Sequence, residues 1–119
     1  MTFPIEIMLR GNQQVFTETV FHPNDNPSTW TTKDATAILR SILLAIDRAQ
    51  NPGAEQEPIV SLRGISWIAS SYQEGVVLAL EIHTASAVAG PFKADPELLT
   101  RLITQAVAEA GEGLGPVVH

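Results

Sequence analysis

Two helical segments, each with its own start signal, constrain this chain more than any other feature. Thr31 is followed three residues later by Asp34, the spacing of a capping box, in which hydroxyl and carboxylate satisfy the first free amides of a helix. Asp95-Pro96-Glu97 supplies an N-cap, a first-position proline and a first-turn acid for a second helix. Asn51-Pro52-Gly53 and Gly111 predict where the two helices end.

Apolar residues recur in both segments at three- and four-residue spacing, so each helix has one face that must pack against another element. In the first helix they are Ala35, Ile38, Leu39, Ile42, Ala45, Ile46 and Ala49, and in the second Leu98, Leu99, Leu102, Ile103, Ala106, Val107 and Ala110.

Period-two alternation predicts a β-hairpin before the first helix. Residues 3–10 and 13–21 flank Gly11-Asn12, a pair suited to a two-residue turn, and this register places Ile7 opposite Phe16. It also leaves Glu18 on the apolar face. Because a buried lone carboxylate is costly, a register shifted by one residue, with Glu18 in solvent, is expected instead.

A second hairpin is predicted before the second helix. Residues 65–72 and a long strand over 76–88 flank Glu74-Gly75. A three-residue loop would place Trp67 opposite Glu81. A two-residue turn is preferred because it gathers the apolar residues on one face: Ile65, Trp67, Ala69, Leu78, Leu80 and Ile82.

The expected fold is therefore α+β, in the order β-β-α-β-β-α, with a four-stranded, mainly antiparallel sheet and two helices packed on one face. Residues 1–111 form a single domain and residues 112–119 a flexible C-terminal tail. Eight identities at a shift of 61 positions also raise a pseudo-twofold ββα repeat, although amphipathic helices share residues by chance.

In this fold the second face of the sheet is open, and it is more apolar than a solvated sheet face usually is. The side chains expected on it are Ser66, Ile68, Ser70, Tyr72, Val77, Ala79, Glu81 and His83.

Composition excludes several classes of function. The chain has a net charge of -6, and its seven Lys and Arg residues are scattered, which argues against nucleic acid or an anionic membrane as a partner. It has no cysteine, and neither a signal peptide nor a transmembrane run is evident, so a cytoplasmic location is expected.

Chemistry has two candidate locations. Glu81 and His83 lie two apart on a strand, but two ligands do not complete a metal site, so neither a metal nor a cofactor is expected. Residues 22–30 form a long loop with His22 and Trp30, groups that bind ligands on a rigid scaffold. Turn formation and a staple against the first helix explain the same residues, and this structural role is favoured.

These observations favour a non-enzymatic binding or assembly module that forms a homodimer through the open sheet face around Ile68, Tyr72, Val77 and Ala79. A protein partner bound at a sheet edge is not separable from this reading by sequence.

The alternative is a small-molecule-binding protein or enzyme. Its site would lie between the open face and the 22–30 loop, with Glu81 and His83 as base and acid and with Trp30 or Tyr72 as a wall.

Overall fold

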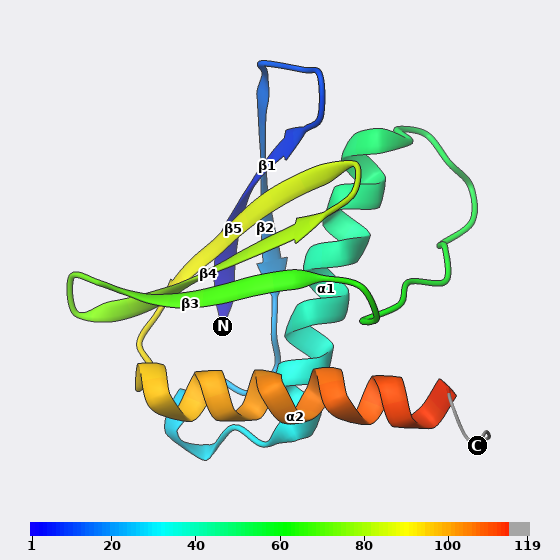
Figure 1. Cartoon of the computed structure of the whole chain (residues 1–119). Coiled ribbons are helices and arrows are strands. Elements are labelled where there is room, and N and C mark those ends of the chain that lie inside the picture. The colour runs from blue at the N-terminus through cyan, green and yellow to red at the C-terminus, as the bar shows by residue number, and fades with distance from the viewer. Residues whose placement is uncertain (115–119) are drawn as a thin grey trace.

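The fold is an antiparallel sheet covered by two helices on one face (Figure 1). The computed structural model describes residues 1–114, with side chains described as far as Ala110. Its elements are β1 (Thr2–Leu9), β2 (Val15–Phe21), the 3-10 turn η1 (Pro27–Thr29), α1 (Thr32–Gln50), β3 (Ser66–Tyr72), β4 (Gly75–Ile82), β5 (Ala85–Phe92) and α2 (Pro96–Leu114).

Both predicted helix starts are confirmed. Thr31 is the N-cap of α1, and the capping box with Asp34 is present. The α2 helix begins at Pro96, and the side chain of Asp95 accepts a hydrogen bond from the Glu97 amide at 3.3 Å. Local signals thus position the helices, because caps satisfy amides that no tertiary contact reaches.

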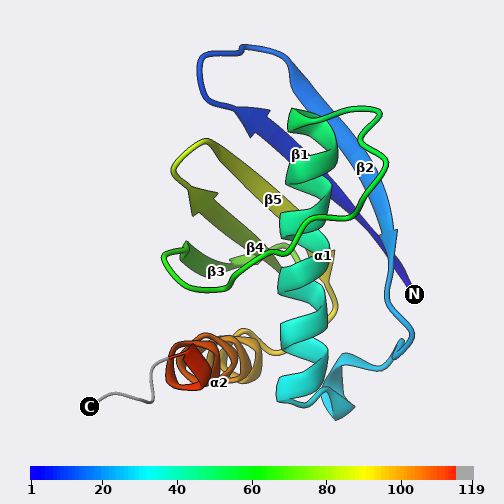
Figure 2. The ribbon, with the colours of Figure 1, turned by 90° about the vertical axis from the view of Figure 1, so that its right-hand side faces the viewer.

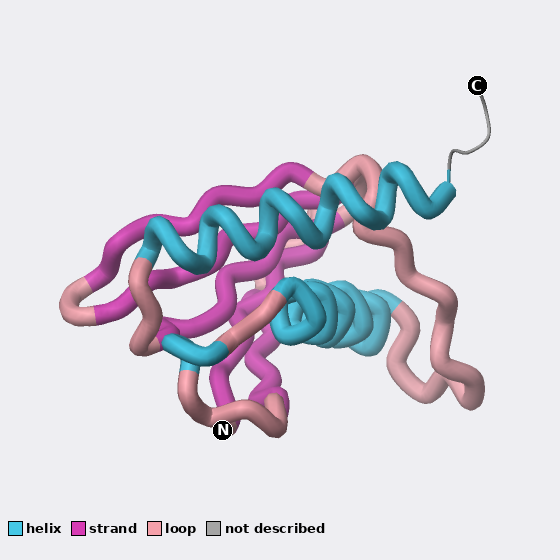
Figure 3. The backbone as a smooth tube through the Cα atoms, turned by 90° about the horizontal axis from the view of Figure 1, so that it is seen from below, coloured by secondary structure: helices cyan, strands magenta, loops and turns pink. Residues whose placement is uncertain are grey.

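The two helices share one side of the sheet. Figure 2 shows α1 in front of the sheet, with α2 beside the lower end of α1. Figure 3 shows that the two helices run across one another. The α1 helix packs on β1, β2 and β5, whereas α2 packs on β3 and on α1. Their stripes and the inward residues of the sheet form one core, in which the Phe3 and Phe92 rings lie 5.0 Å apart.

The sheet has five strands, in the order β2-β1-β5-β4-β3, and not the expected four. The predicted long strand over residues 76–88 is divided by a turn at His83-Thr84, after which β5 runs back between β4 and β1. At this turn the side chains that face the helices change from even-numbered to odd-numbered residues. Even-numbered residues of β4 face the helices, whereas odd-numbered Ala85, Ala87 and Ala89 do so in β5.

The first hairpin has the register predicted from Gly11-Asn12, with Ile7 paired to Phe16 and Ile5 to Glu18. The expected one-residue shift, introduced to expose Glu18, is wrong. Glu18 remains on the helix-facing side and forms an ion pair with Arg48 of α1. Because β2 is an edge strand, this carboxylate is only partly buried and keeps contact with solvent.

The second hairpin turns at Gln73-Glu74, one residue earlier than predicted. Trp67 pairs with Leu80. The preferred register placed Trp67 opposite Ile82, two residues further along β4, and the alternative placed it opposite Glu81, one residue further. A two-residue shift preserves the faces, so the predicted core face survives. Gly75 lies in β4, where an added Cβ would lie 2.5 Å from the Phe92 carbonyl oxygen, while Gln73 adopts the left-handed turn conformation with φ 53°.

The proposed ββα repeat is not confirmed. The second unit has three strands, and the shift of 61 matches buried Ile7 with exposed Ile68. The predicted end of the second helix at Gly111 is wrong, since α2 continues to Leu114. Residues 115–119 of the predicted tail lie outside the described residues.

Candidate functional site

The face of the sheet opposite the helices, here called the open face, is uncovered by any described element. Strand registers and alternation place on it Thr2, Pro4, Glu6, Met8, Val15, Thr17, Thr19, Phe21, Ser66, Ile68, Ser70, Tyr72, Val77, Ala79, Glu81, Ser86 and Val88. The interaction residues predicted from β3 and β4, including Ile68, Tyr72 and Val77, are therefore brought together on one surface.

Exposed apolar side chains gather on this face. Of the seven large hydrophobic side chains exposed in the described part of the chain, six lie on the open face, and the seventh, Ile59, lies in the loop before β3. Ile68 is 61% exposed and Tyr72 51%. The six are Met8, Val15, Phe21, Ile68, Tyr72 and Val88.

Sequence reasoning found the β3 and β4 half of this surface and missed the other half. Met8 of β1 and Val88 of β5 are each exposed by more than two fifths. Sequence reasoning did not assign these two residues to the open face, because the order of the strands in the sheet was unknown. The change at His83-Thr84 from even-numbered to odd-numbered core residues was the sequence feature that could have indicated a separate strand β5, and with it an outward-facing Val88.

A shallow hollow of about 300 Å³ lies on the open face where β3, β4 and β5 run side by side. Ile68 and Val88 form its apolar walls, and Ser66, Glu81 and Ser86 supply polar groups. Glu81 pairs across the sheet with both serines, so its carboxylate has hydroxyl neighbours on either side.

Glu81 and His83 both lie at the end of the sheet, but they do not lie on the same strand as predicted. His83 lies in the β4–β5 turn, and a second hollow of about 200 Å³ contains both residues together with Arg10. The Arg10 amide donates a hydrogen bond of 2.9 Å to the Thr84 carbonyl, which holds the end of β1 against this turn. Sequence reasoning missed Arg10, because only the β1–β5 pairing brings it here.

The 22–30 loop does not take part in either hollow. His22 and Trp30 are buried on the helix side of the sheet, and their rings lie 5.6 Å apart in an edge-to-face arrangement. Trp30 Nε1 donates to the Asn24 carbonyl at 3.0 Å. The structure therefore does not bring His22 and Trp30 to the open face, and the Trp30 ring packs edge-to-face against His22 and Phe92 instead.

Asp34 connects the loop to the start of α1. One carboxylate oxygen accepts from the Thr31 amide at 2.9 Å, and the other lies 2.8 Å from His22 Nε2. Burial acts to raise the pKa of Asp34, but the hydrogen bonds from Thr31 and His22 and the attraction of the imidazole outweigh it and hold the pKa below 3.8. The cluster stabilises the helix start.

Comparison with known proteins gives no relative: no protein-family model, curated protein or solved structure matches the chain. Among the side chains that the structure describes, as far as Ala110, no group of three or more His, Asp or Glu is placed to hold a metal ion. None of the helices within residues 1–114 is long and apolar enough to span a bilayer.

Proposed function

We propose that this protein is a non-enzymatic assembly module that forms a homodimer by stacking the open faces of two copies. The observation that carries the proposal is the concentration of exposed large hydrophobic side chains on that one face. Apolar patches of this kind on a small domain mark interaction surfaces, and a twofold dimer closes such a patch with no second partner.

The size of the open face supports a second copy as its occupant. Five strands about 4.8 Å apart, with about seven residues of about 3.3 Å each, give a projected area of about 550 Å² per copy. Two copies bury about 1,100 Å² by this measure, and more when the corrugation of side chains is included. Stable interfaces bury about 1,200–2,000 Å² in total, so the flat projection alone falls just short of the lower end of that range and reaches it once the corrugation of the side chains is added.

The chemistry of the face is also compatible with a copy of itself. Around its apolar residues lie hydroxyl groups, which donate and accept hydrogen bonds and therefore suit a self-complementary interface. They belong to Thr2, Thr17, Thr19, Ser66, Ser70, Tyr72 and Ser86. Two sheets of this kind pack about 10 Å apart with their strands nearly aligned.

Sedimentation velocity of the full chain tests the proposal. Wild-type protein is expected to dimerise at micromolar concentration, and Ile68→Asp is expected to weaken the dimer at least tenfold, because a charge replaces an apolar contact. Ile59→Asp is the matched control, since Ile59 is exposed but lies off the open face. A wild-type monomer at high micromolar concentration, or equal effects of the two variants, would contradict the proposal.

A second candidate function is the binding of a small molecule in the hollow that holds Arg10, Glu81 and His83. The observation that favours it is that Arg10, Glu81 and His83 line one hollow of about 200 Å³. NMR titration with acetate and with glycine tests this idea. Shifts confined to the β1–β2 and β4–β5 turns and lost in Arg10→Gln would support it, and unchanged spectra at millimolar ligand would reject it.

A further inference from the structure

The five strands contain no Lys, Arg or His residue, although they contain carboxylates. On the open face these are Glu6 and Glu81, both exposed. Glu6 has Thr17 and Val88 as its cross-strand neighbours, and Glu81 has Ser66 and Ser86. Each carboxylate is therefore set among hydroxyl and apolar groups, without a cation beside it in the sheet.

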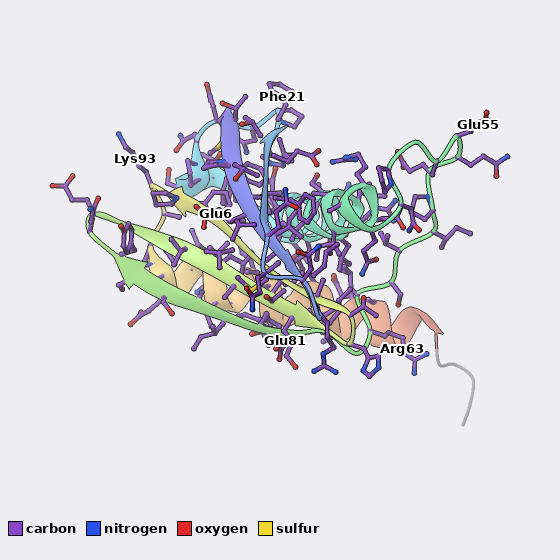
Figure 4. All side chains as sticks on the ribbon, turned by 90° about the horizontal axis from the view of Figure 1, so that it is seen from above. Glu6, Phe21, Glu55, Arg63, Glu81 and Lys93 are labelled. Carbon is purple, nitrogen blue, oxygen red and sulfur yellow. The ribbon has the colours of Figure 1, made fainter. Side chains whose placement is uncertain are left out.

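The remaining charged or titratable groups lie at the margins of the open face or outside it. Arg10 and His83 line the hollow beside Glu81, and neither forms an ion pair with it in the part of the chain that the structure describes. Lys93 follows the end of β5, at the side of the molecule away from Glu81 in Figure 4. Tyr72 is the remaining titratable side chain within the face.

We propose that self-association through the open face is proton-linked, so that the dimer tightens as the pH falls because Glu6 and Glu81 take up protons on burial. This inference rests on the proposed function. Stacking two copies brings four carboxylates into one interface whose strands carry no cation. Removal of water from a carboxylate disfavours its charged form, and a like charge nearby adds to that effect.

The effect arises on association rather than within one copy. Glu6 and Glu81 lie on strands that flank β5 and are offset by two residues, which corresponds to about 12 Å between their Cα atoms. Charges at that distance in water are largely screened at physiological salt. Face-to-face contact removes the water, and a protonated carboxyl then donates to a hydroxyl of the opposing copy.

The sign of the pH dependence follows from proton linkage. A carboxyl whose pKa is raised in the dimer binds a proton more tightly there, so lowering the pH toward that pKa favours the dimer. Each proton taken up changes the association constant by as much as tenfold per pH unit. At least tenfold tighter association is therefore expected at pH 5 than at pH 7.5.

The experiment is sedimentation velocity of the full chain across that pH range. Glu6→Gln with Glu81→Gln is expected to dimerise at pH 7.5 about as tightly as wild type at pH 5, with little further change. Glu55→Gln with Glu57→Gln removes the same charge from the exposed loop before β3 and is expected to keep the wild-type pH response. Glu55 of this loop lies away from Glu6 and Glu81 in Figure 4.

The outcomes separate the two proposals. Absence of dimer at every pH, in wild type and in the Glu6, Glu81 variant alike, would refute the proposed function itself. A dimer that is insensitive to pH, or equal effects of the two double variants, would overturn the proton linkage alone. Loss of the pH response in His83→Gln would assign it to the imidazole and would likewise overturn the inference.

Discussion

Removal of the Asp34 side chain tests whether the buried cluster at the start of α1 is structural. Its carboxylate joins the Thr31 amide and the His22 imidazole, and His22 is only 5% exposed. In Asp34→Ala the capping contact is lost, at a cost of about 1 kcal/mol. The imidazole also loses its partner while still buried, which adds about 1–3 kcal/mol. A total destabilisation of about 2–4 kcal/mol is expected.

Urea denaturation at pH 7, followed by circular dichroism, measures this difference in the free energy of unfolding. Asp34→Asn is the companion variant, since it keeps the size of the side chain and removes its ionisation. Its deficit at pH 7 is expected to be smaller than that of Asp34→Ala, because an amide oxygen still accepts from the Thr31 amide. A loss below about 0.5 kcal/mol in Asp34→Ala would refute the structural reading of the cluster.

The pH dependence gives a second check on Asp34. Because its pKa is lowered in the folded protein, its ionised form contributes stability above pH 3.8, and that contribution disappears as the pH falls through the lower folded pKa. The difference in unfolding free energy between wild type and Asp34→Asn should therefore narrow between pH 5 and pH 2. An equal difference at both pH values would show that the charge of Asp34 contributes nothing.

Three further substitutions test other parts of the structure by urea denaturation. Gly75→Ala is expected to lower the free energy of unfolding by about 1–3 kcal/mol, since the added Cβ would lie 2.5 Å from the Phe92 carbonyl oxygen. An unchanged free energy of unfolding would contradict this close approach. Glu18→Gln should cost less than about 1 kcal/mol, because its partner Arg48 is half exposed, and a larger loss would indicate a buried pair. Ile59→Ser should change stability by no more than about 0.5 kcal/mol, as Ile59 is fully exposed, and a larger loss would place it in a packed environment.

Sequence by itself determined the features that depend on a few neighbouring residues. The capping box at Thr31 and Asp34 and the cap at Asp95 position the helices, because their hydrogen bonds close within one turn. The register of the first hairpin agrees with the one that Gly11-Asn12 alone predicted, although the expected exposure of Glu18 had favoured a shifted register. Alternation also assigned most residues to the correct face, since a strand has a period of two.

Tertiary structure decided how these elements are arranged. The turn at His83-Thr84 has neither glycine nor proline, so the strong β preference of residues 76–88 concealed it, and β5 then separates the two hairpins. Likewise, Gly75 is required by the approach of Phe92, a contact that exists only once β5 lies beside β4.

The candidate site divides in the same way. Ile68 and Tyr72 were assigned to an open face from local alternation. Glu6 and Met8 joined that face, and Arg10 reached the hollow at its end, only through the pairing of β1 with β5, some eighty residues apart in sequence. Local patterns specify which way a side chain points, because that depends on its own strand. Which side chains become neighbours depends on the order of the strands, and that order is set by the burial of two helical stripes against one shared sheet.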